Sequence, residues 1–281
     1  MMASSHAPDD SGFPSWLVEA ALDAAVALPS APSVLGISGV QGSGKSTLAL
    51  QVATLARRRG LRVALLSLDD FYLSQAQRRA LAERVHPLLA TRGPPGTHDL
   101  PLALKVLDRL RAGQPVRLPR FDKLDDERVP ASNWPLLDAP ADLVILEGWM
   151  LGVPAQQASA LADPVNALER AEDPDATWRT WCNRALEEEY PALWRRVDAV
   201  WMLKAPAFDV VPAWRWQQEQ SLQSGSPFRR TMARSELERF VQLFERVSRH
   251  ALRALPPLAQ RVIQLDQYRA PVRRAGLDPA P

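Results

Sequence analysis

The sequence has few of the features that mark secreted or membrane proteins. Cys182 is the only cysteine among 281 residues, so no intrachain disulfide can form and we expect it to pack in the core. No apolar run approaches the roughly 18 residues that a membrane-spanning helix needs. The first residues show no basic segment followed by an apolar stretch, as a secretory signal would. We therefore expect a cytoplasmic protein that does not associate with a membrane.

Neither sign of charge is in large excess. The net charge is only +2, which does not argue for a nucleic-acid partner, and nothing in the pattern indicates the oligomeric state. Hydrophobic residues make up 46% of the chain, enough for a sizeable core. We expect a disordered tail over residues 1–12 and a single domain over residues 13–281.

Five apolar runs alternate with segments of helical periodicity. The runs expected to form strands are 33–38, 62–68, 140–148, 198–205 and 261–266, and the expected helices include 14–29, 46–59, 101–112 and 176–190. This alternation predicts a three-layer α/β sandwich with a mostly parallel five-stranded sheet covered on both faces. Residues 91–135 and 206–234 break the pattern, and loops that long inside a compact domain are usually functional or disordered. The fold class that we expect adds a helical lid and helical insertions to the sandwich.

The segment "GVQGSGKS" at residues 39–46 matches the phosphate-binding pattern G-x-x-x-x-G-K-[ST] between an expected strand and an expected helix. We expect Lys45 to reach the β- and γ-phosphates of ATP, Ser46 to bind Mg²⁺, and the helix that opens at Thr47 to face the anion. The residues expected to bind the nucleotide are Gly39, Gly42, Ser43, Gly44, Lys45, Ser46 and Thr47. Such a loop indicates a nucleotide but does not by itself identify a reaction.

Carboxylates follow two of the expected strands at the edge where ligands of parallel sheets bind. Because neighbouring strand residues point to opposite faces, we expect Asp69 to act as the general base and Asp70 to cap a turn or contact a metal-bound water. Glu147 is expected to hold Mg²⁺ through water or to orient the acceptor, and it is the alternative base. A purely structural alternative is that Asp69 and Asp70 begin a helix at "FYLSQAQRRALAE".

Five motifs in chain order resemble those of the plant-type D-glycerate 3-kinase family, which belongs with the uridine kinase, phosphoribulokinase and pantothenate kinase group of P-loop kinases. They are GVQGSGKST, SLDDFYL, RGPPGTHDL, PRFDKLDDERVP and LEGWMLG, and the resemblance runs from about Ser33 to about Arg273. It implies transfer of the ATP γ-phosphate to a small acceptor with Mg²⁺ as cofactor, D-glycerate being converted to 3-phosphoglycerate. The alternatives are a nucleoside or pantothenate-like acceptor, or a non-catalytic nucleotide-binding regulator.

The resemblance also implies an acceptor site formed by residues that follow the second expected strand and by an insertion at about residues 74–135. Its residues would be Asp70, Tyr72, Arg92, His98, Asp99, Arg120 and Lys123. Arginine binds a carboxylate with two parallel hydrogen bonds, which favours an anionic hydroxy acid as the partner molecule. Several of these residues have structural alternatives: His98 as a turn-stabilising side chain, Asp99 as the N-cap of the helix over 101–112, and Arg120 and Lys123 as solvated surface charges.

Residues 206–234 resemble the lid of such kinases. An arginine brought over the phosphates would neutralise charge in the transition state, and Arg215 is our candidate, with Arg229 and Arg230 as weaker ones. The tryptophans on either side of Arg215 are expected to pack rather than to bind adenine. The predicted catalytic residues are Lys45, Asp69, Glu147 and Arg215, and the predicted metal ligands are Ser46 and Glu147.

Overall fold

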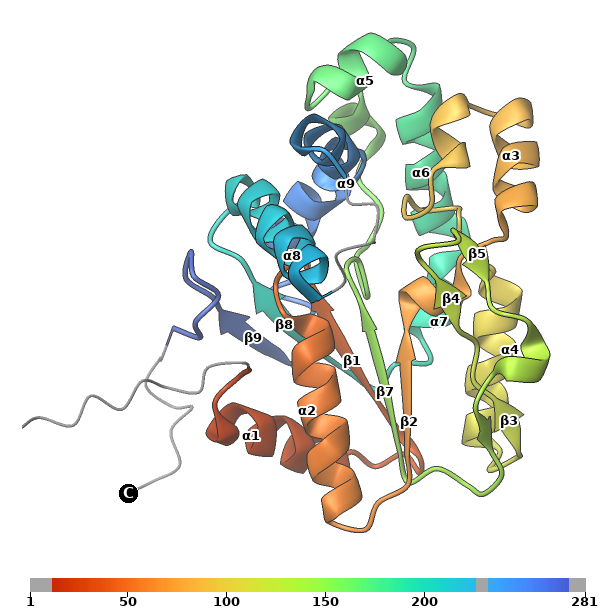
Figure 1. Cartoon of the computed structure of the whole chain (residues 1–281), viewed down its shortest axis with the longest axis vertical. Coiled ribbons are helices and arrows are strands. Elements are labelled where there is room, and N and C mark those ends of the chain that lie inside the picture. The colour runs from red at the N-terminus through yellow and green to blue at the C-terminus, as the bar shows by residue number, and fades with distance from the viewer. Residues whose placement is uncertain (1–11, 226–231, 273–281) are drawn as a thin grey trace, which may run out of the picture.

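The computed structural model describes residues 12–225 and 232–272. Its centre is a five-stranded parallel sheet in the order β2-β7-β1-β8-β9 (Figure 1). The strands are β1 (Ser33–Gly39), β2 (Val63–Ser67), β7 (Leu143–Gly148), β8 (Ala199–Lys204) and β9 (Arg261–Gln264). Each of the five apolar runs forms one of these strands, so the predicted sheet is confirmed.

Helices cover both faces of this sheet. They are α1 (Ser15–Val26), α2 (Lys45–Arg58), α3 (Gln75–Arg84), α4 (Leu100–Arg111), α5 (Ala167–Glu172), α6 (Thr177–Glu188), α7 (Tyr190–Trp194), α8 (Val211–Gly225) and α9 (Arg234–Ala254). Short 3₁₀ turns lie at Leu68–Phe71, Pro87–Ala90, Ala131–Asn133, Ala158–Leu161 and Phe208–Val210. Successive strand residues alternate between two apolar clusters, as Val34 and Leu35 show. The three-layer α/β sandwich is therefore confirmed.

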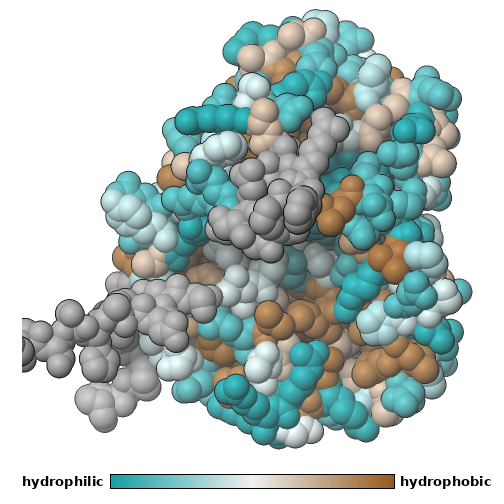
Figure 2. Space-filling view, viewed as in Figure 1, coloured by the Kyte–Doolittle hydropathy of each residue, from teal (hydrophilic) through white to brown (hydrophobic). Residues whose placement is uncertain are grey.

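The two clusters are formed by different helices. Buried residues of α1, α2 and the start of α8 pack on one face, and those of α4, α6 and α7 pack on the other, while α9 contributes to both. Cys182 is buried in the second of these clusters, as expected. Each large apolar side chain buried in this way stabilises the fold by about 1.5–3 kcal/mol. Hydrophilic and hydrophobic side chains are intermixed across the face of the molecule seen in Figure 2.

The insertion between β2 and β7 contains more regular structure than its composition suggests. Besides α3 and α4 it holds two short antiparallel pairs. These are β3 (Val116–Arg117) with β6 (Leu136–Leu137), and β4 (Phe121–Asp122) with β5 (Glu127–Arg128). No helix in the described part of the chain is both long and apolar enough to cross a membrane.

The segment 206–234, where a helical lid is expected, is helical over most of its length. Helix α8 occupies Val211–Gly225, and α9 begins at Arg234. The segment has few aliphatic residues, but Val211 and Trp214 supply the apolar surface that buries α8. Residues 226–231, with Arg229 and Arg230, lie outside the described residues, as does most of the expected disordered tail.

Candidate active site

The phosphate-binding loop follows β1 and leads directly into α2. Gly42 and Gly44 adopt φ angles of 77° and 87°, a left-handed conformation that favours glycine. Gly39 is needed for a different reason, because a Cβ there would lie 2.9 Å from the carbonyl oxygen of Leu203. Helix α2 begins at Lys45, two residues before the predicted start at Thr47, which is exposed in the first turn. Ser43 is fully buried under the loop.

Glu147 lies beside this loop at the end of β7. Its Oε1 accepts a hydrogen bond from Ser46 Oγ at 3.0 Å, and its Oε2 is 3.9 Å from Lys45 Nζ. Glu147 is buried, and Oε2 has no hydrogen-bond partner among the described residues. Oxygen ligands of this kind suit Mg²⁺, which usually completes its coordination with phosphates and water. The described residues contain no group of three or more acidic, histidine or cysteine side chains that could hold a metal alone.

A cavity of about 690 Å³ opens above the loop. The predicted nucleotide-binding residues that line it are Gly42, Lys45 and Ser46. The predicted acceptor-side and lid residues that line it are Asp69, Tyr72, Arg92, Lys123 and Arg215. Residues from five separate segments of the chain therefore meet around one space.

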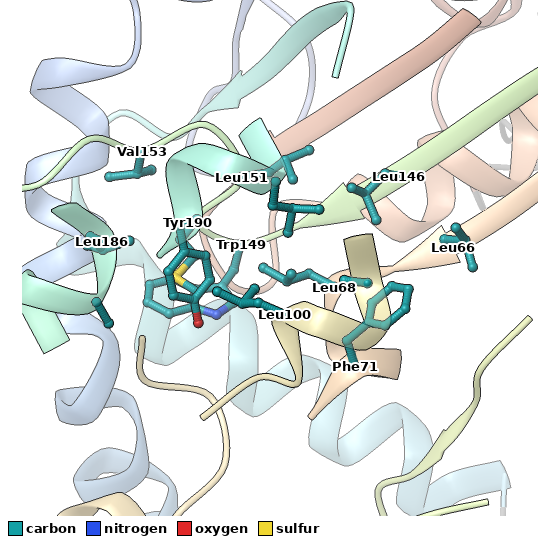
Figure 3. Close-up of a cluster of buried hydrophobic side chains, with 14 of the residues drawn as sticks. Leu66, Leu68, Phe71, Leu100, Leu146, Trp149, Leu151, Val153, Leu186 and Tyr190 are labelled. Atoms are coloured by element: carbon teal, nitrogen blue, oxygen red, sulfur yellow. The ribbon is translucent and has the colours of Figure 1, made fainter. Parts of the chain in front are cut away.

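Asp69 enters this cavity from the 3₁₀ turn Leu68–Phe71, which follows β2. Leu68 and Phe71 are almost fully buried in the apolar cluster of Figure 3, and they hold the turn in place. Asp69 consequently lines the cavity, whereas Asp70 does not. We expected this difference from strand alternation, but it arises from the turn. The alternative of a long helix beginning at the aspartates is wrong, because α3 begins at Gln75 with Ser74 as its N-cap.

Both oxygens of the Asp69 carboxylate have a partner. The Tyr72 hydroxyl donates to Oδ1 at 2.7 Å, and Lys123 Nζ donates to Oδ2 at 2.6 Å. Burial alone would raise the pKa of Asp69, but the charges of Lys123 and Lys45 and the two hydrogen bonds together hold that pKa well below its ordinary value. Asp69 is therefore ionised at neutral pH and available to accept a proton.

Arg92 lies next to Lys123 on the wall of the cavity. It donates to Asp126 Oδ1 at 2.5 Å and to the carbonyl oxygen of Lys123 at 3.2 Å. Guanidinium carries five N–H donors, so these two bonds leave donors that can bind an anion in the cavity. Arg92 and Lys123 thus place two positively charged side chains on the wall of the cavity that Asp69 also lines.

Four predicted acceptor-binding residues do not line the cavity. Their side chains instead bind other groups of the protein. Asp70 accepts from the backbone N–H of Ser67 and pairs with Arg120 at 3.2 Å. Asp99 caps α4 by accepting from the N–H of Leu102 at 3.0 Å, as its structural alternative predicted. These contacts fix the ends of β2 and α4 around the site.

His98 is the fourth of these residues. Its Nδ1 lies 2.6 Å from the Tyr190 hydroxyl, and its ring lies 4.7 Å from that of Tyr72. Burial lowers the pKa of His98 to about 4, so the ring is neutral. His98 therefore supports Tyr72 from behind rather than facing the cavity.

Arg215 reaches the cavity from the first turns of α8. Burial lowers the pKa of its guanidinium, and its Nε has no partner in the described part of the chain. The helix lies directly against the phosphate-binding loop, since a Cβ on Gly42 would be 2.7 Å from that of Trp214. Trp214 is buried and donates to the carbonyl oxygen of Gln267, so it packs as predicted.

The sequence interpretation missed the apolar end of the cavity. Trp149, Phe240 and Phe244 line it, and the rings of Trp149 and Phe244 meet edge to face at 5.0 Å. Trp149 lies in the quoted motif LEGWMLG, two residues after Glu147, which was the available signal. Nothing in the local pattern of α9 indicates that Phe240 and Phe244 line the same cavity as Trp149, which lies in a different segment of the chain.

Comparisons with known proteins agree with this architecture. Residues 34–166 match the model of the phosphoribulokinase/uridine kinase family. An uncharacterized kinase of Schizosaccharomyces pombe is 35% identical over 202 residues, which cover 69% of this chain and 72% of that protein. The chloroplastic D-glycerate 3-kinase of Arabidopsis thaliana is 31% identical over 202 residues, covering 67% of this chain but only 41% of its own length.

A solved structure supports the fold over a longer stretch. The D-glycerate 3-kinase of Cryptococcus neoformans var. grubii superposes with a TM-score of 0.74 at 24% identity, covering 93% of this chain and 99% of that one. That structure shows the fold, and the match to the Schizosaccharomyces pombe kinase, together with the phosphate-binding loop and the carboxylates at its edge, establishes the family. The chain belongs to the phosphoribulokinase/uridine kinase family of P-loop kinases, in the group that includes D-glycerate 3-kinase.

Proposed function

We propose that this ATP-dependent kinase phosphorylates D-glycerate to give 3-phosphoglycerate. The observation that carries the proposal is the position of Asp69. This partly buried, ionised carboxylate pairs with Lys123 and lines the same cavity as Lys45 and Arg92. A base, a phosphate site and an anion site in one space are the parts that phosphoryl transfer to a hydroxy acid requires.

Asp69 serves as the general base in the proposed reaction. The acceptor hydroxyl oxygen attacks the γ-phosphorus, and the bond from that phosphorus to the oxygen bridging to the β-phosphate breaks. ADP leaves, and the hydroxyl proton passes to Asp69. The hydrogen bond from the Tyr72 hydroxyl orients the carboxylate for this transfer.

Two cations of the chain stabilise the charge that develops on the phosphates. Lys45 lies at the start of α2, and Arg215 faces the cavity from α8. Preorganised charges of this kind contribute most where water is excluded. Ser46 and Glu147 would hold Mg²⁺, which when bound supplies further positive charge to the phosphates.

Arg92 and Lys123 support an anionic acceptor. A carboxylate placed between them would gain charge-assisted hydrogen bonds, which are about twice as strong as those between neutral groups. A nucleoside has no group that needs both cations, although pantothenate also carries a carboxylate. D-glycerate is preferred here because of the similarity to D-glycerate 3-kinases, and the acceptor therefore needs a direct test.

We further propose that residues 13–281 act as one cytoplasmic kinase domain. In it, residues 74–135 form the acceptor-side insertion and residues 206–234 form the lid.

The test is acceptor-dependent ADP release from Mg-ATP by the purified protein. D-glycerate, L-glycerate, uridine and pantothenate are compared at equal concentrations, with an Asp69→Asn variant as the matched inactive control. We expect strong turnover with D-glycerate alone. Equal or greater turnover with uridine or pantothenate would contradict the proposed acceptor. ATP binding without turnover of any acceptor would support a regulatory protein instead.

A further inference from the structure

The Lys123–Asp69 ion pair combines two groups that the proposed reaction needs separately. Lys123 Nζ lies 2.6 Å from Asp69 Oδ2, inside the cavity. The reaction requires Asp69 as a base, and a carboxylate acceptor requires Lys123 as a cation. In the structure these two groups bind each other.

The lysine can change partners without moving the backbone that carries it. Lys123 follows β4, in the turn of the β4–β5 hairpin, and Asp126 of that turn forms ion pairs with Arg92 and with the fully buried Arg78. Arg92 also binds the carbonyl oxygen of Lys123. The side chain of Lys123 is 53% exposed and ends in a compact charge on a flexible four-carbon stem.

We propose that Lys123 determines selectivity for anionic acceptors at the catalytic step as well as in binding. Without an anion it pairs with Asp69, and the carboxylate of a bound hydroxy acid draws it away, leaving the base to the acceptor hydroxyl. The inference rests on the proposed function, because it assigns Lys123 a second role in the same site.

The ion pair lowers the strength of Asp69 as a base more than it blocks the approach of a hydroxyl group to Asp69. An ionised carboxylate has about four lone-pair positions, so a hydroxyl can still reach Asp69 while Lys123 and Tyr72 are bound. A cation within about 4–6 Å, however, lowers a carboxyl pKa by about 1–3 units, and a weaker base accelerates proton transfer less. When Lys123 binds the acceptor instead, Asp69 becomes a stronger base. The hydrogen bond from Tyr72 keeps the Asp69 carboxylate in its orientation.

This arrangement has a consequence for molecules without a negative charge. Water or a neutral alcohol that enters the cavity meets the weakened base. For water, the oxygen would attack the γ-phosphorus, the proton would pass to Asp69, and phosphate and ADP would be released. The ion pair therefore suppresses unproductive ATP hydrolysis, and removal of the lysine should increase it.

The experiment compares the wild type with Lys123→Met, Lys123→Gln and Lys123→Arg. Lys105→Met, which removes an exposed lysine of α4 outside this cavity, is the control for loss of one positive charge. ADP release is measured with D-glycerate, with glycerol as the neutral analogue, and without an acceptor, and thermal melting confirms folding.

We expect the two neutral variants to lose activity with D-glycerate but to gain about tenfold with glycerol and with water, because the base is stronger. Lys105→Met should keep the wild-type rates, and Lys123→Arg, which retains the positive charge, should show no gain in either neutral reaction. A purely structural or acceptor-binding role of Lys123 predicts no gain in either neutral reaction.

Glycerol turnover and acceptor-free hydrolysis at or below the wild-type rate in both neutral variants would overturn the inference. The acceptor-free arm also separates it from the proposed function. If the wild type did not phosphorylate D-glycerate but both neutral variants hydrolysed ATP faster, the proposed acceptor would fail while the role of Lys123 would stand.

Discussion

The two sides of the cavity are built in different ways. On the nucleotide side, one continuous segment supplies the loop, the lysine and the start of α2, and backbone conformation at Gly42 and Gly44 shapes it. On the acceptor side, the groups come from the turn after β2, from the segment before α4 and from the β4–β5 hairpin, and ion pairs hold them together. The nucleotide side therefore depends on one local segment of the sequence, and the acceptor side depends on the tertiary structure.

The acceptor side contains two kinds of polar residue. Asp69, Tyr72, Arg92 and Lys123 face the cavity. Behind them, a supporting layer consisting of Asp70, His98, Asp99 and Arg120 binds other protein groups. Both layers consist of polar residues in the same motifs, so only their surroundings distinguish them. Substitutions in the cavity should change activity, and those in the supporting layer should change stability.

The largest effect is expected for Lys45→Ala. Loss of this cation removes binding of the ground-state phosphates as well as stabilisation of the transition state, so kcat/KM should fall by about 10³-fold or more. ATP binding measured by calorimetry should weaken in parallel. Lys105→Ala is the control. Unchanged ATP affinity in Lys45→Ala would show that the loop does not hold the phosphates as described.

Asp69→Asn should affect the acceptor side alone. The amide cannot accept the hydroxyl proton, so kcat should fall by about 10²–10³-fold while ATP affinity stays within about threefold. Single-turnover ADP release and nucleotide titration separate the two quantities. The matched variant Asp70→Asn should retain most of its kcat. If Asp69→Asn remained active, Glu147 would become the candidate base.

Gly42→Ala tests the contact between the loop and α8. The new methyl group would lie 2.7 Å from the Cβ of Trp214, in a residue whose φ is 77°. Gly60 is a close control, with a φ of 83° and no atom within 4 Å of an added Cβ. Both variants should lose about 1–2 kcal/mol of stability from backbone strain. Only Gly42→Ala should raise the KM for ATP, by roughly tenfold, because α8 must move. Equal KM values in the two variants would contradict the contact.

Local patterns predicted most of the fold and the nucleotide side. The five strands and the P-loop each depend on residues adjacent in sequence, so periodicity and spacing were sufficient. The helical lid was expected from the resemblance and not from periodicity, because the burial of α8 depends on Val211 and Trp214 meeting a distant cluster.

The acceptor side was predicted only as a set of polar residues. Its motifs named the correct segments, but they could not show that Arg120 pairs with Asp70 while Lys123 pairs with Asp69. The partner choice depends on the fold of the insertion. The same is true of Phe240 and Phe244, which reach the cavity only because α9 packs beside Trp149.

His98→Gln should change the pH dependence of stability. The pKa of His98 is about 4 in the folded protein, below its ordinary value of 6.5, so between these values the unfolded chain binds a proton that the folded protein does not. Stability should therefore fall as the pH drops from 6.5 to 4, by up to about 3 kcal/mol. In the variant this part of the slope should disappear, which urea unfolding at several pH values can measure. An unchanged slope would contradict the buried, neutral state of His98.

The smallest effect, and the sharpest comparison between the two layers, is expected from Arg120→Met. The Asp70–Arg120 pair is partly exposed, with Arg120 35% exposed, so its loss should cost only about 1 kcal/mol, or about 2–4 °C in Tm. The kcat and the KM for the acceptor should stay within about twofold, because Arg120 does not line the cavity.

Arg92→Met is the matched variant, since it removes the same kind of side chain from the cavity wall. It should raise the KM for D-glycerate by roughly 10- to 100-fold, the loss expected for one charge-assisted contact with a carboxylate. If Arg120→Met raised that KM as much as Arg92→Met, the acceptor would extend behind the Asp69 turn, and the division into a cavity layer and a supporting layer would be wrong.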